Sequence, residues 1–322
     1  MNRFLQHVKE GLAKTPKALS SRYFYDEIGD GLFQEIMQLE QYYLPACEMQ
    51  IIQQQSQLMA KDLAQTHKSL QIVELGAGDG SKTKHLLKQF EPYFDALEYV
   101  AMDISESILD VNKQEVESEV SSIDISSVAG NYFQTYKDLP DTSYGRLVLF
   151  LGANIGNYLF DDAVAFCQYV KQGLRKNDAF IVAFDLVKHP RKIIAAYDDS
   201  EGITKAFNLN LLNRMNRELG ADFDTSKFEH FPYYNPTNGI TESHIVSLED
   251  QIVHFSDGFD VRFEAFEAIH TEISKKYFPK DIQCLSDNSG LKISQTYYNS
   301  TKEYAFVSFT RNNEKTLNHI NR

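Results

Sequence analysis

Residues 71–83 decide the fold, and they read Gln-Ile-Val-Glu-Leu-Gly-Ala-Gly-Asp-Gly-Ser-Lys-Thr. An apolar, β-branched run ends in three alternating glycines, Gly76, Gly78 and Gly80, and apolar residues with helical spacing begin at Leu86. This order predicts a strand, a tight loop and a helix. Because glycine has no Cβ, such a loop can turn tightly and its backbone can approach a ligand closely. We therefore expect the first strand-to-helix turn of a nucleotide-binding sheet.

The spacing of the glycines indicates which ligand the loop binds. Dinucleotide-binding loops read G-x-G-x-x-G, and here Ser81 stands where that pattern needs its last glycine. Glu74 lies two residues before the first glycine and completes the acidic-x-G-x-G-x-G pattern that is typical of S-adenosylmethionine (SAM) methyltransferases. The alternative is a purely structural turn, because a glycine-rich loop alone is a weak signal.

The next apolar run, residues 97–105, predicts a second strand that ends in Asp103. An acidic residue at this strand tip can accept hydrogen bonds from the hydroxyl groups of a ribose. Alternatively, Asp103 or Ser105 caps the helix that follows. The two roles are compatible, since Ser105 can cap the helix while Asp103 binds the ribose.

Composition limits the class of protein. The chain has 322 residues, 43% of them hydrophobic, which is ample for a sizeable core. A net charge of −13 argues against a nucleic-acid partner, because phosphate neutralisation needs clustered Lys and Arg. Neither a signal-peptide core nor a long uncharged apolar run is present, so we expect no membrane partner. We expect a cytoplasmic monomer.

Cysteine and histidine spacing gives no sign of a metal centre. Cys47, Cys167 and Cys284 are far apart and form no C-x-x-C motif, which argues against a disulfide framework or a zinc site. The nine histidines contain no H-E-x-x-H arrangement. We therefore expect no metal.

Predicted strands and helices alternate from residue 70 to 186, as in a doubly wound parallel sheet. The fourth strand, residues 145–152, is a continuous apolar run after Arg146 and is expected to be buried on both faces. It runs into residues 153–158 at its carboxyl end, where open sheets bind ligands. Residues 291–299 and 304–310 predict a closing strand pair. The predicted fold class is α/β: a Rossmann-like, class I SAM-methyltransferase sheet with a terminal antiparallel hairpin.

The rest of the chain predicts a second, smaller α+β domain. Helical patterns cover residues 26–39 and 202–219, alternating patterns cover 242–248 and 259–266, and residues 231–239 read as a loop rich in Pro, Tyr and Asn. From Asn312 onward the chain reads as a frayed polar tail. The predicted division is a SAM-binding domain of residues 60–190 and 275–314, and a second domain of residues 1–59 and 191–274. The family resemblance given next implies that this second domain is the substrate-binding domain.

Eight segments resemble the histidine N-α-methyltransferase family of ergothioneine biosynthesis, and the similarity covers nearly the whole chain. These segments are YFYD (23–26), QYYLP (41–45), ELGAG (74–78), FLGANIGN (150–157), AYDD (196–199), FNLNLL (207–212), NRELGADF (216–223) and HTEIS (270–274). The resemblance implies a SAM domain and a separate substrate domain, with free L-histidine bound between them. It also implies methylation of the α-amino nitrogen, three times, to give the trimethylated betaine hercynine.

By matching motif, the resemblance implies that Asn157 and Tyr197 hold the carboxylate or amine of the substrate, and that Glu272 with Ser274 grips its imidazole. A carboxylate and a hydroxyl can indeed satisfy the two ring nitrogens of an imidazole. The implied residues that line the amine, and that we take as catalytic, are Tyr25 and Tyr42. A wall of tyrosines suits a growing cationic head group through cation–π attraction of about 0.5–2 kcal/mol.

On the cofactor side, the resemblance implies that Gly76, Ala77 and Gly78 pack against the amino-acid part of SAM, with Lys82 near its carboxylate. It implies that Asp103 holds the ribose and that Asn131 and Tyr132 flank the adenine. The family usually has an aspartate at the place of Asn131; an amide can still accept from the adenine amine.

One departure from the family concerns the substrate ring. The resembled family commonly places a methionine against this ring, and the present chain has Val246 at that place. Val246 reshapes the pocket, and two alternatives accompany histidine methylation. One is the same chemistry on another aromatic amino acid, such as a tryptophan derivative, or on a histidine analogue. The other is a SAM-binding module without catalysis.

Overall fold

The computed structural model describes residues 3–312, which fall into two compact units. The four-stranded unit comprises Met1–Pro45 and Val187–Lys276, and the seven-stranded unit comprises Ala46–Leu186 and Tyr277–Arg322. Residues 46–59, which we expected in the substrate-binding domain, belong to the seven-stranded unit. The predicted frayed tail, beyond Asn312 itself, lies outside the described residues.

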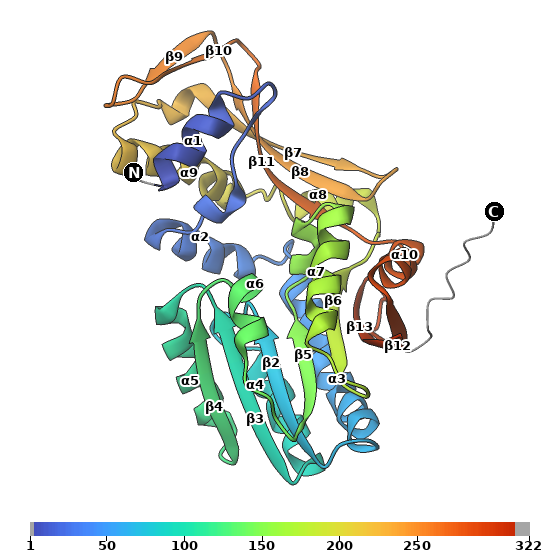
Figure 1. Ribbon diagram of the computed structural model, residues 1–322. Helices are drawn as coiled ribbons and strands as arrows, with labels where there is room; N and C mark the ends of the chain where they lie inside the picture. The colour runs from blue at the N-terminus through green and yellow to red at the C-terminus, as the bar shows by residue number, and fades with distance from the viewer. Residues whose placement is uncertain (1–2, 313–322) are drawn as a thin grey trace, which may run out of the picture. The chain divides into compact units, whose positions relative to one another are not determined.

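The seven-stranded unit is a doubly wound sheet with the order β12-β13-β6-β5-β2-β3-β4 (Figure 1). Strands β2 to β6 are parallel, whereas β13 runs antiparallel to β6 and β12 antiparallel to β13. Its strands are β2 (Ser69–Leu75), β3 (Ala96–Asp103), β4 (Ile123–Ala129), β5 (Gly145–Phe150), β6 (Ala179–Asp185), β12 (Leu291–Tyr298) and β13 (Tyr304–Arg311). This topology confirms the predicted class I methyltransferase fold with its closing hairpin.

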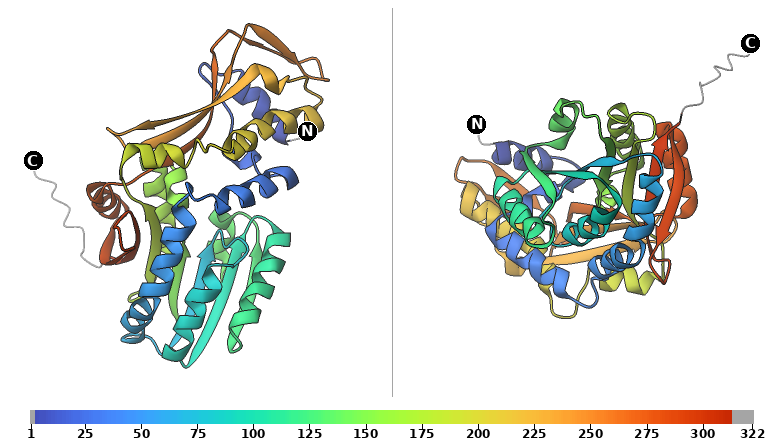
Figure 2. Two further views of the ribbon diagram at one scale, coloured as in Figure 1. Left: turned by 180° about the vertical axis from the view of Figure 1, so that it is seen from behind. Right: turned by 90° about the horizontal axis from the view of Figure 1, so that it is seen from below.

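Helices cover both faces of this sheet (Figures 1 and 2), and α4 packs against α5 while α7 packs against α10. The helices are α3 (Leu44–Ala64), α4 (Thr83–Phe90), α5 (Glu106–Glu119), α6 (Tyr132–Thr135), α7 (Phe160–Gln172) and α10 (Pro279–Ser289). All residues of β5 and β6 are buried, which confirms the burial predicted for the strand at residues 145–152.

The four-stranded unit contains a sheet of order β1-β11-β8-β7 and a separate β9-β10 hairpin. Its strands are β1 (Lys17–Ala18), β7 (Phe228–Asn235), β8 (Ile240–Ser247), β9 (Gln251–His254), β10 (Asp260–Phe263) and β11 (Ala268–Lys275). Its helices are α1 (Arg3–Leu12), α2 (Glu27–Gln38), α8 (Pro190–Ala195) and α9 (Ile203–Leu219). Ile245 of β8 and Ile269 of β11 are fully buried in one core with Phe207 and Leu211 of α9. The inner face of this sheet, as we name it, is therefore the face that packs on α9.

The predicted loop at residues 231–239 is wrong for its first half, because residues 228–235 form β7. Pro232 caused the error, since a proline cannot donate a hydrogen bond to a neighbouring strand. The structure tolerates Pro232 because β7 lies at the edge of its sheet and, among the described strands, pairs only with β8.

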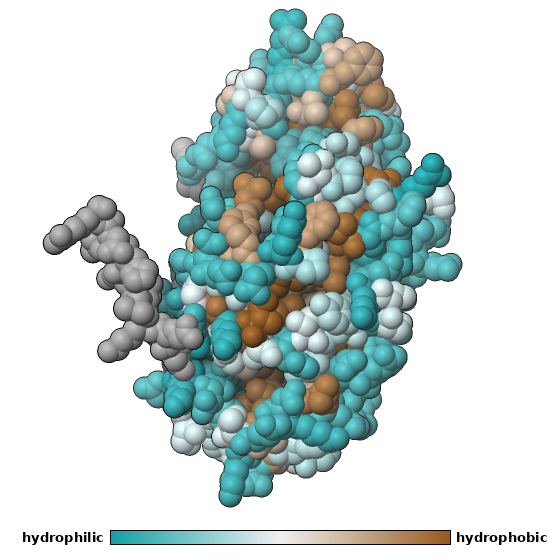
Figure 3. Space-filling view, turned by 90° about the vertical axis from the view of Figure 1, so that its right-hand side faces the viewer, coloured by the Kyte–Doolittle hydropathy of each residue, from teal (hydrophilic) through white to brown (hydrophobic). Residues whose placement is uncertain are grey.

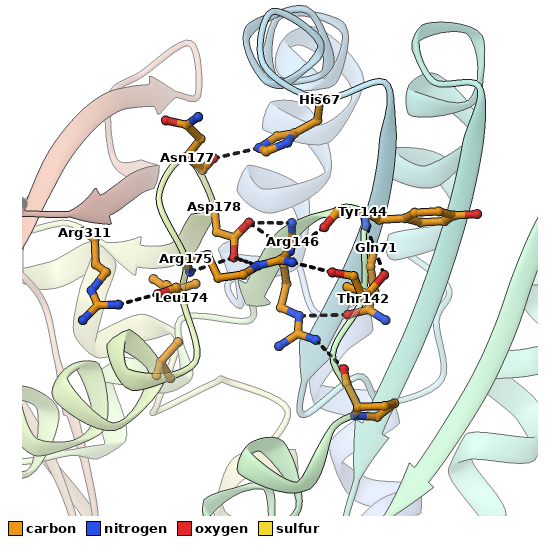
Figure 4. A network of polar contacts seen from close by, with 12 residues as sticks. His67, Gln71, Thr142, Tyr144, Arg146, Leu174, Arg175, Asn177, Asp178 and Arg311 are labelled. Atoms are coloured by element: carbon orange, nitrogen blue, oxygen red, sulfur yellow. Dashed lines mark hydrogen bonds and ion pairs between the residues drawn. The ribbon is translucent and has the colours of Figure 1, made fainter.

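A buried polar network joins the amino ends of the central strands, away from the glycine loop (Figure 4). Arg146 of β5 donates from Nε to Gln71 Oε1 at 2.8 Å, and its backbone N–H donates to Asp178 Oδ1 at 2.9 Å. Arg175 donates to the other oxygen of Asp178 from its backbone N–H at 2.8 Å. Because both Arg146 and Asp178 are buried and hydrogen-bonded, this network fixes the amino ends of these strands.

Hydrophilic side chains cover most of the face drawn in Figure 3, with small apolar patches between them. Within residues 3–312, every helix is either too short or too polar to cross a membrane. The cytoplasmic location stays a prediction.

Candidate functional site

The glycine loop between β2 and α4 uses three residues with left-handed backbone. Gly76, Gly78 and Gly80 have φ angles of +73°, +55° and +74°. A Cβ at Gly80 would lie 2.9 Å from the side-chain nitrogen of Asn112, whereas a Cβ at Gly78 would meet no atom of the described residues within 4 Å. Gly80 is thus required by packing inside the protein, and Gly78 faces open space that a ligand can approach.

Asp103 lies at the tip of β3 and holds the glycine loop. Its Oδ2 accepts from the Gly78 N–H at 3.1 Å, and its Oδ1 accepts from the Ser105 N–H at 3.1 Å. Ser105 in turn caps α5, because its Oγ accepts from the Ile108 N–H. The capping role expected of Ser105 is confirmed. Asp103 thus places a half-buried carboxylate beside the open loop. That this carboxylate binds a ribose stays a prediction.

Asn131 and Tyr132 follow β4. The Asn131 Oδ1 caps α6 by accepting from the Phe133 N–H at 3.0 Å, so its amide nitrogen is the group best able to meet a ligand. The Tyr132 hydroxyl lies 2.8 Å from the Tyr158 hydroxyl, and its ring packs edge-on against Phe150 at 6.1 Å. Tyr132 is therefore fixed by the core of the sheet unit rather than mobile at its surface.

Lys82 is held by Glu48, a residue of α3 that sequence reasoning missed. The Glu48 side chain is only 1% exposed; its Oε1 accepts from Lys82, and its Oε2 accepts from the Gly152 N–H at 2.7 Å and the Tyr304 hydroxyl at 2.6 Å. Burial opposes the charged form of Lys82, but the Glu48 carboxylate outweighs it and raises the pKa of the ammonium. Helical spacing could have indicated that Glu48 is buried, because it lies four residues before the fully buried Ile52 and therefore on the same face of the helix.

Asn157 belongs to the seven-stranded unit, at the end of a short 3-10 helix, Asn154–Asn157, that follows β5. The chain enters this helix through two left-handed residues, Gly152 and Ala153, with φ of +72° and +55°. The Asn157 side chain is exposed at the carboxyl edge of the sheet.

A β-bulge decides which way the HTEIS segment faces in the four-stranded unit. On β11, His270 pairs with His244 of β8, but Glu272 pairs with Ser243, so Thr271 is an extra residue without its own partner position. The Thr271 hydroxyl is buried and lies 2.9 Å from the Ser243 carbonyl oxygen. The bulge is thus anchored to the strand it opposes.

The bulge brings Glu272 and Ser274 to the inner face of the sheet. There they pair with Ser243 and Thr241, which are both 1% exposed. The hydroxyl oxygens of Ser243 and Thr241 lack a hydrogen-bond partner among the described residues. Because buried polar groups are normally paired, this face has hydrogen-bonding capacity to offer a ligand.

The buried Lys276 organises this face. Its Nζ donates to the Tyr197 hydroxyl at 2.7 Å and to the Ser274 Oγ at 2.8 Å, and its side chain is fully buried. An ammonium can only donate, so both hydroxyl oxygens accept from it and keep their own hydrogens for another acceptor. Tyr197 and Ser274 are therefore brought together as two oriented donors. Sequence reasoning missed Lys276.

The Glu272 carboxylate makes no hydrogen bond within residues 3–312. Burial raises its pKa to about 7, against which the nearby Lys276 ammonium acts in the opposite direction. Burial, and next the negative charge of Glu272, also raises the pKa of the Tyr25 hydroxyl. Tyr25 is thus a neutral phenol near neutral pH, and Glu272 is a carboxylate whose environment favours an N–H donor.

Aromatic rings form a wall in the same unit. Tyr25 and Tyr42 each contact Phe33 of α2 edge-on, with ring centroids 5.6 Å and 6.3 Å apart, and Phe33 also packs on Phe207 at 5.9 Å. The structure therefore brings together the two predicted tyrosines. Phe33 lies in the helix predicted over residues 26–39, and no role at the site was predicted for it from the sequence alone.

Val246 does not lie where the resemblance implied. It pairs with Ala268, on the opposite face of β8 from Ser243, because alternate residues of a strand face opposite sides. The expectation that Val246 meets a ring held by Glu272 is wrong.

Comparisons with known proteins identify the relatives of this chain. Residues 4–311 match the model of a SAM-dependent, histidine-specific methyltransferase family. A histidine N-alpha-methyltransferase of Mycobacterium tuberculosis is 32% identical over 85% of this chain and 84% of its own length. One of Mycolicibacterium smegmatis is 32% identical over 90% of this chain and 89% of its length. Ergothioneine biosynthesis protein 1 of Schizosaccharomyces pombe is 26% identical over 91% of this chain and 39% of its length.

Proposed function

Since this chain belongs to the family of SAM-dependent, histidine-specific methyltransferases, we propose that it methylates the α-amino nitrogen of free L-histidine three times to give hercynine. The single observation that carries this proposal is the half-buried Glu272 carboxylate, which lacks a hydrogen bond among the described residues and stands on one face with Ser274. The relation to an ergothioneine biosynthesis protein supports the trimethylated product.

The inner face of the four-stranded sheet is suited to a neutral imidazole. Glu272 accepts from the ring N–H, and Ser274 donates its hydrogen to the other ring nitrogen. Lys276 fixes this direction because it already donates to the Ser274 oxygen. An indole has a single N–H and no ring acceptor, so it would leave the Ser274 hydrogen without a partner. The arrangement thus favours histidine over a tryptophan-like substrate.

The residues proposed for the substrate head group are Tyr197, with its oriented hydroxyl, and the amide of Asn157. Tyr25, Tyr42 and Phe33 supply aromatic faces, which attract a quaternary ammonium by about 0.5–2 kcal/mol. The raised pKa of Tyr25 keeps its hydroxyl protonated, so we assign it to orientation and proton relay rather than to a phenolate base.

The seven-stranded unit fits SAM. The open backbone at Gly78, with Gly76 and Ala77 beside it, suits the amino-acid part of the cofactor, and the Asp103 carboxylate suits a ribose. Lys82 would meet the cofactor carboxylate while already paired with Glu48.

Asn131 and Tyr132 would flank the adenine of the cofactor. Bound SAM supplies an electrophilic methyl group on a sulfonium. The residues of the chain contribute by orienting the substrate amine toward that methyl group, which in favourable cases lowers the reaction barrier by about 7–11 kcal/mol.

A mass-spectrometric assay tests the proposal. Purified protein is mixed with SAM and, separately, with each of the twenty amino acids and mono- and dimethylhistidine. We expect histidine to gain three methyl groups, and Glu272→Gln to lower kcat/KM for histidine at least tenfold. Glu264→Gln, an exposed carboxylate of the same unit, is the matched control and should leave the rate unchanged.

Each other outcome overturns a stated part of the proposal. Gain of mass on another amine, with none on histidine, would retain SAM chemistry and remove the imidazole role of Glu272. Accumulation of dimethylhistidine as the final product would reject trimethylation. No gain on any amino acid, with SAM still bound, would favour a module without catalysis.

A further inference from the structure

The outer face of the four-stranded sheet, opposite the inner face, carries a cluster that the function leaves unused. Glu242 and His244 lie two residues apart on β8, so their side chains share one face. His270 of β11 is the direct cross-strand partner of His244. Figure 1 shows the two strands, β8 and β11, side by side. One ligand atom from each of the three residues lies within 4.8 Å of the others.

We propose that Glu242, His244 and His270 bind a divalent transition-metal ion of the zinc type. Two imidazoles and one carboxylate form a common zinc ligand set, and three protein ligands leave a coordination position for water. The His244 Nε2 lies 3.7 Å from the Glu242 Oε2, and the two imidazole rings are 5.3 Å apart between centroids. Atoms around one tetrahedral zinc lie roughly 3.3 Å apart, so small side-chain rotations bring the three ligands together.

The cluster is open to solvent. All three side chains are intermediate in exposure, which leaves the ion a path to the site.

Sequence spacing could not show this cluster. His244 and His270 are separated by the whole β9-β10 hairpin, and the expectation of no metal rested on local motifs only. Their pairing across β8 and β11 is what creates the ligand set.

The position of the cluster indicates what the ion would do. His270 immediately precedes the bulge residue Thr271, and the bulge turns Glu272 to the inner face. A metal that joins His270 to β8 would therefore clamp the last regular pair before the bulge. Its role would be to stabilise the strand register rather than to take part in methyl transfer.

Cobalt and zinc titrations test the proposal on the full chain, stripped of metal with EDTA and free of any purification tag. We expect one equivalent of Co²⁺ to give visible absorption bands, Zn²⁺ to displace it, and Zn²⁺ to raise the melting temperature. His270→Ala and the shape-conserving Glu242→Gln should each weaken binding at least tenfold. His254→Ala is the matched control, because His254 also faces a carboxylate, Asp260 at 2.8 Å, in the same unit.

Equal affinity in wild type, His270→Ala and Glu242→Gln would overturn the proposal, and so would the absence of saturable Co²⁺ or Zn²⁺ binding. Circular dichroism of each variant separates loss of the site from loss of the fold. The readouts are spectroscopic and thermal, so they are independent of whether histidine is the substrate.

Discussion

Replacing the buried Lys276 by methionine tests how the inner face is built. Methionine keeps most of the apolar stem and removes the ammonium, which donates to Tyr197 at 2.7 Å and to Ser274 at 2.8 Å. Without it, neither hydroxyl is held as a donor toward the substrate. A net hydrogen bond is worth about 0.5–1.5 kcal/mol, so two misdirected donors cost about 1–3 kcal/mol, or roughly 5- to 150-fold in kcat/KM for histidine.

The same change has a second effect that a merely structural role would not produce. The Lys276 ammonium lowers the pKa of Glu272, which burial has raised to about 7. Removing that charge raises the Glu272 pKa further. If the carboxylate form binds the imidazole, kcat/KM falls as pH drops through the Glu272 pKa, and Lys276→Met moves this acid limb to higher pH.

The assay is kcat/KM for histidine from pH 6 to 9, with the SAM dissociation constant measured separately and expected to be unchanged. Lys275→Met is the matched control, because the Nζ of this neighbouring lysine donates to the Asn238 carbonyl oxygen instead. Glu272→Gln shows which part of the acid limb belongs to the enzyme, since the substrate imidazole titrates in the same range. A loss of less than twofold in Lys276→Met, an equal loss in Lys275→Met, or an unmoved acid limb would refute the reasoning.

Three further predictions concern the seven-stranded unit. Glu48→Ala should lower the free energy of unfolding by about 3–5 kcal/mol in urea titrations, because Lys82 and the buried Tyr304 hydroxyl lose their shared partner. The control is Gln54→Ala, an exposed position on the same helix, which should have little effect. Burial raises the pKa of Glu74 to about 7 in the folded chain, whereas its ordinary value is 4.5. Between these two values the unfolded chain binds fewer protons than the folded chain, so the free energy of unfolding falls as pH rises from 4.5 to 7. Glu74→Gln should flatten that part of the stability profile, and an unchanged slope would assign it to other groups. Gly78→Ala should weaken SAM binding at least tenfold in calorimetry while Gly80→Ala, whose Cβ meets Asn112, should mainly lower the melting temperature; the reverse order would contradict the loop assignment.

The sequence allowed the seven-stranded sheet to be predicted nearly strand by strand. The reason is that its information is local: an apolar run ends at Gly76, and the next strand ends at Asp103. The closing hairpin, predicted at residues 291–299 and 304–310, was equally readable. Strand β7 was not, because Pro232 is compatible with a strand only at a sheet edge, and edge position is a tertiary property.

The candidate site was predictable as a set of residues but not as an arrangement. The motifs supplied Glu272 and Ser274, whereas nothing in their spacing showed that Lys276 donates to Ser274. Glu48 was missed because a lone acid in an amphipathic helix usually lies at the surface, and its partner Lys82 is 34 residues away. Val246 was misplaced because the face of a strand follows from its register, which pairing partners determine.

The bulge at Thr271 allows this segment to change its length by one residue without turning the carboxylate. Thr271 has no partner position on β8, so its deletion would leave His270 and Glu272 as neighbours in a regular strand, and neighbours face opposite sides. The inward direction of Glu272 therefore follows from its pairing with Ser243. A homologue with one residue fewer here is expected to lose the bulge and to keep the inward carboxylate.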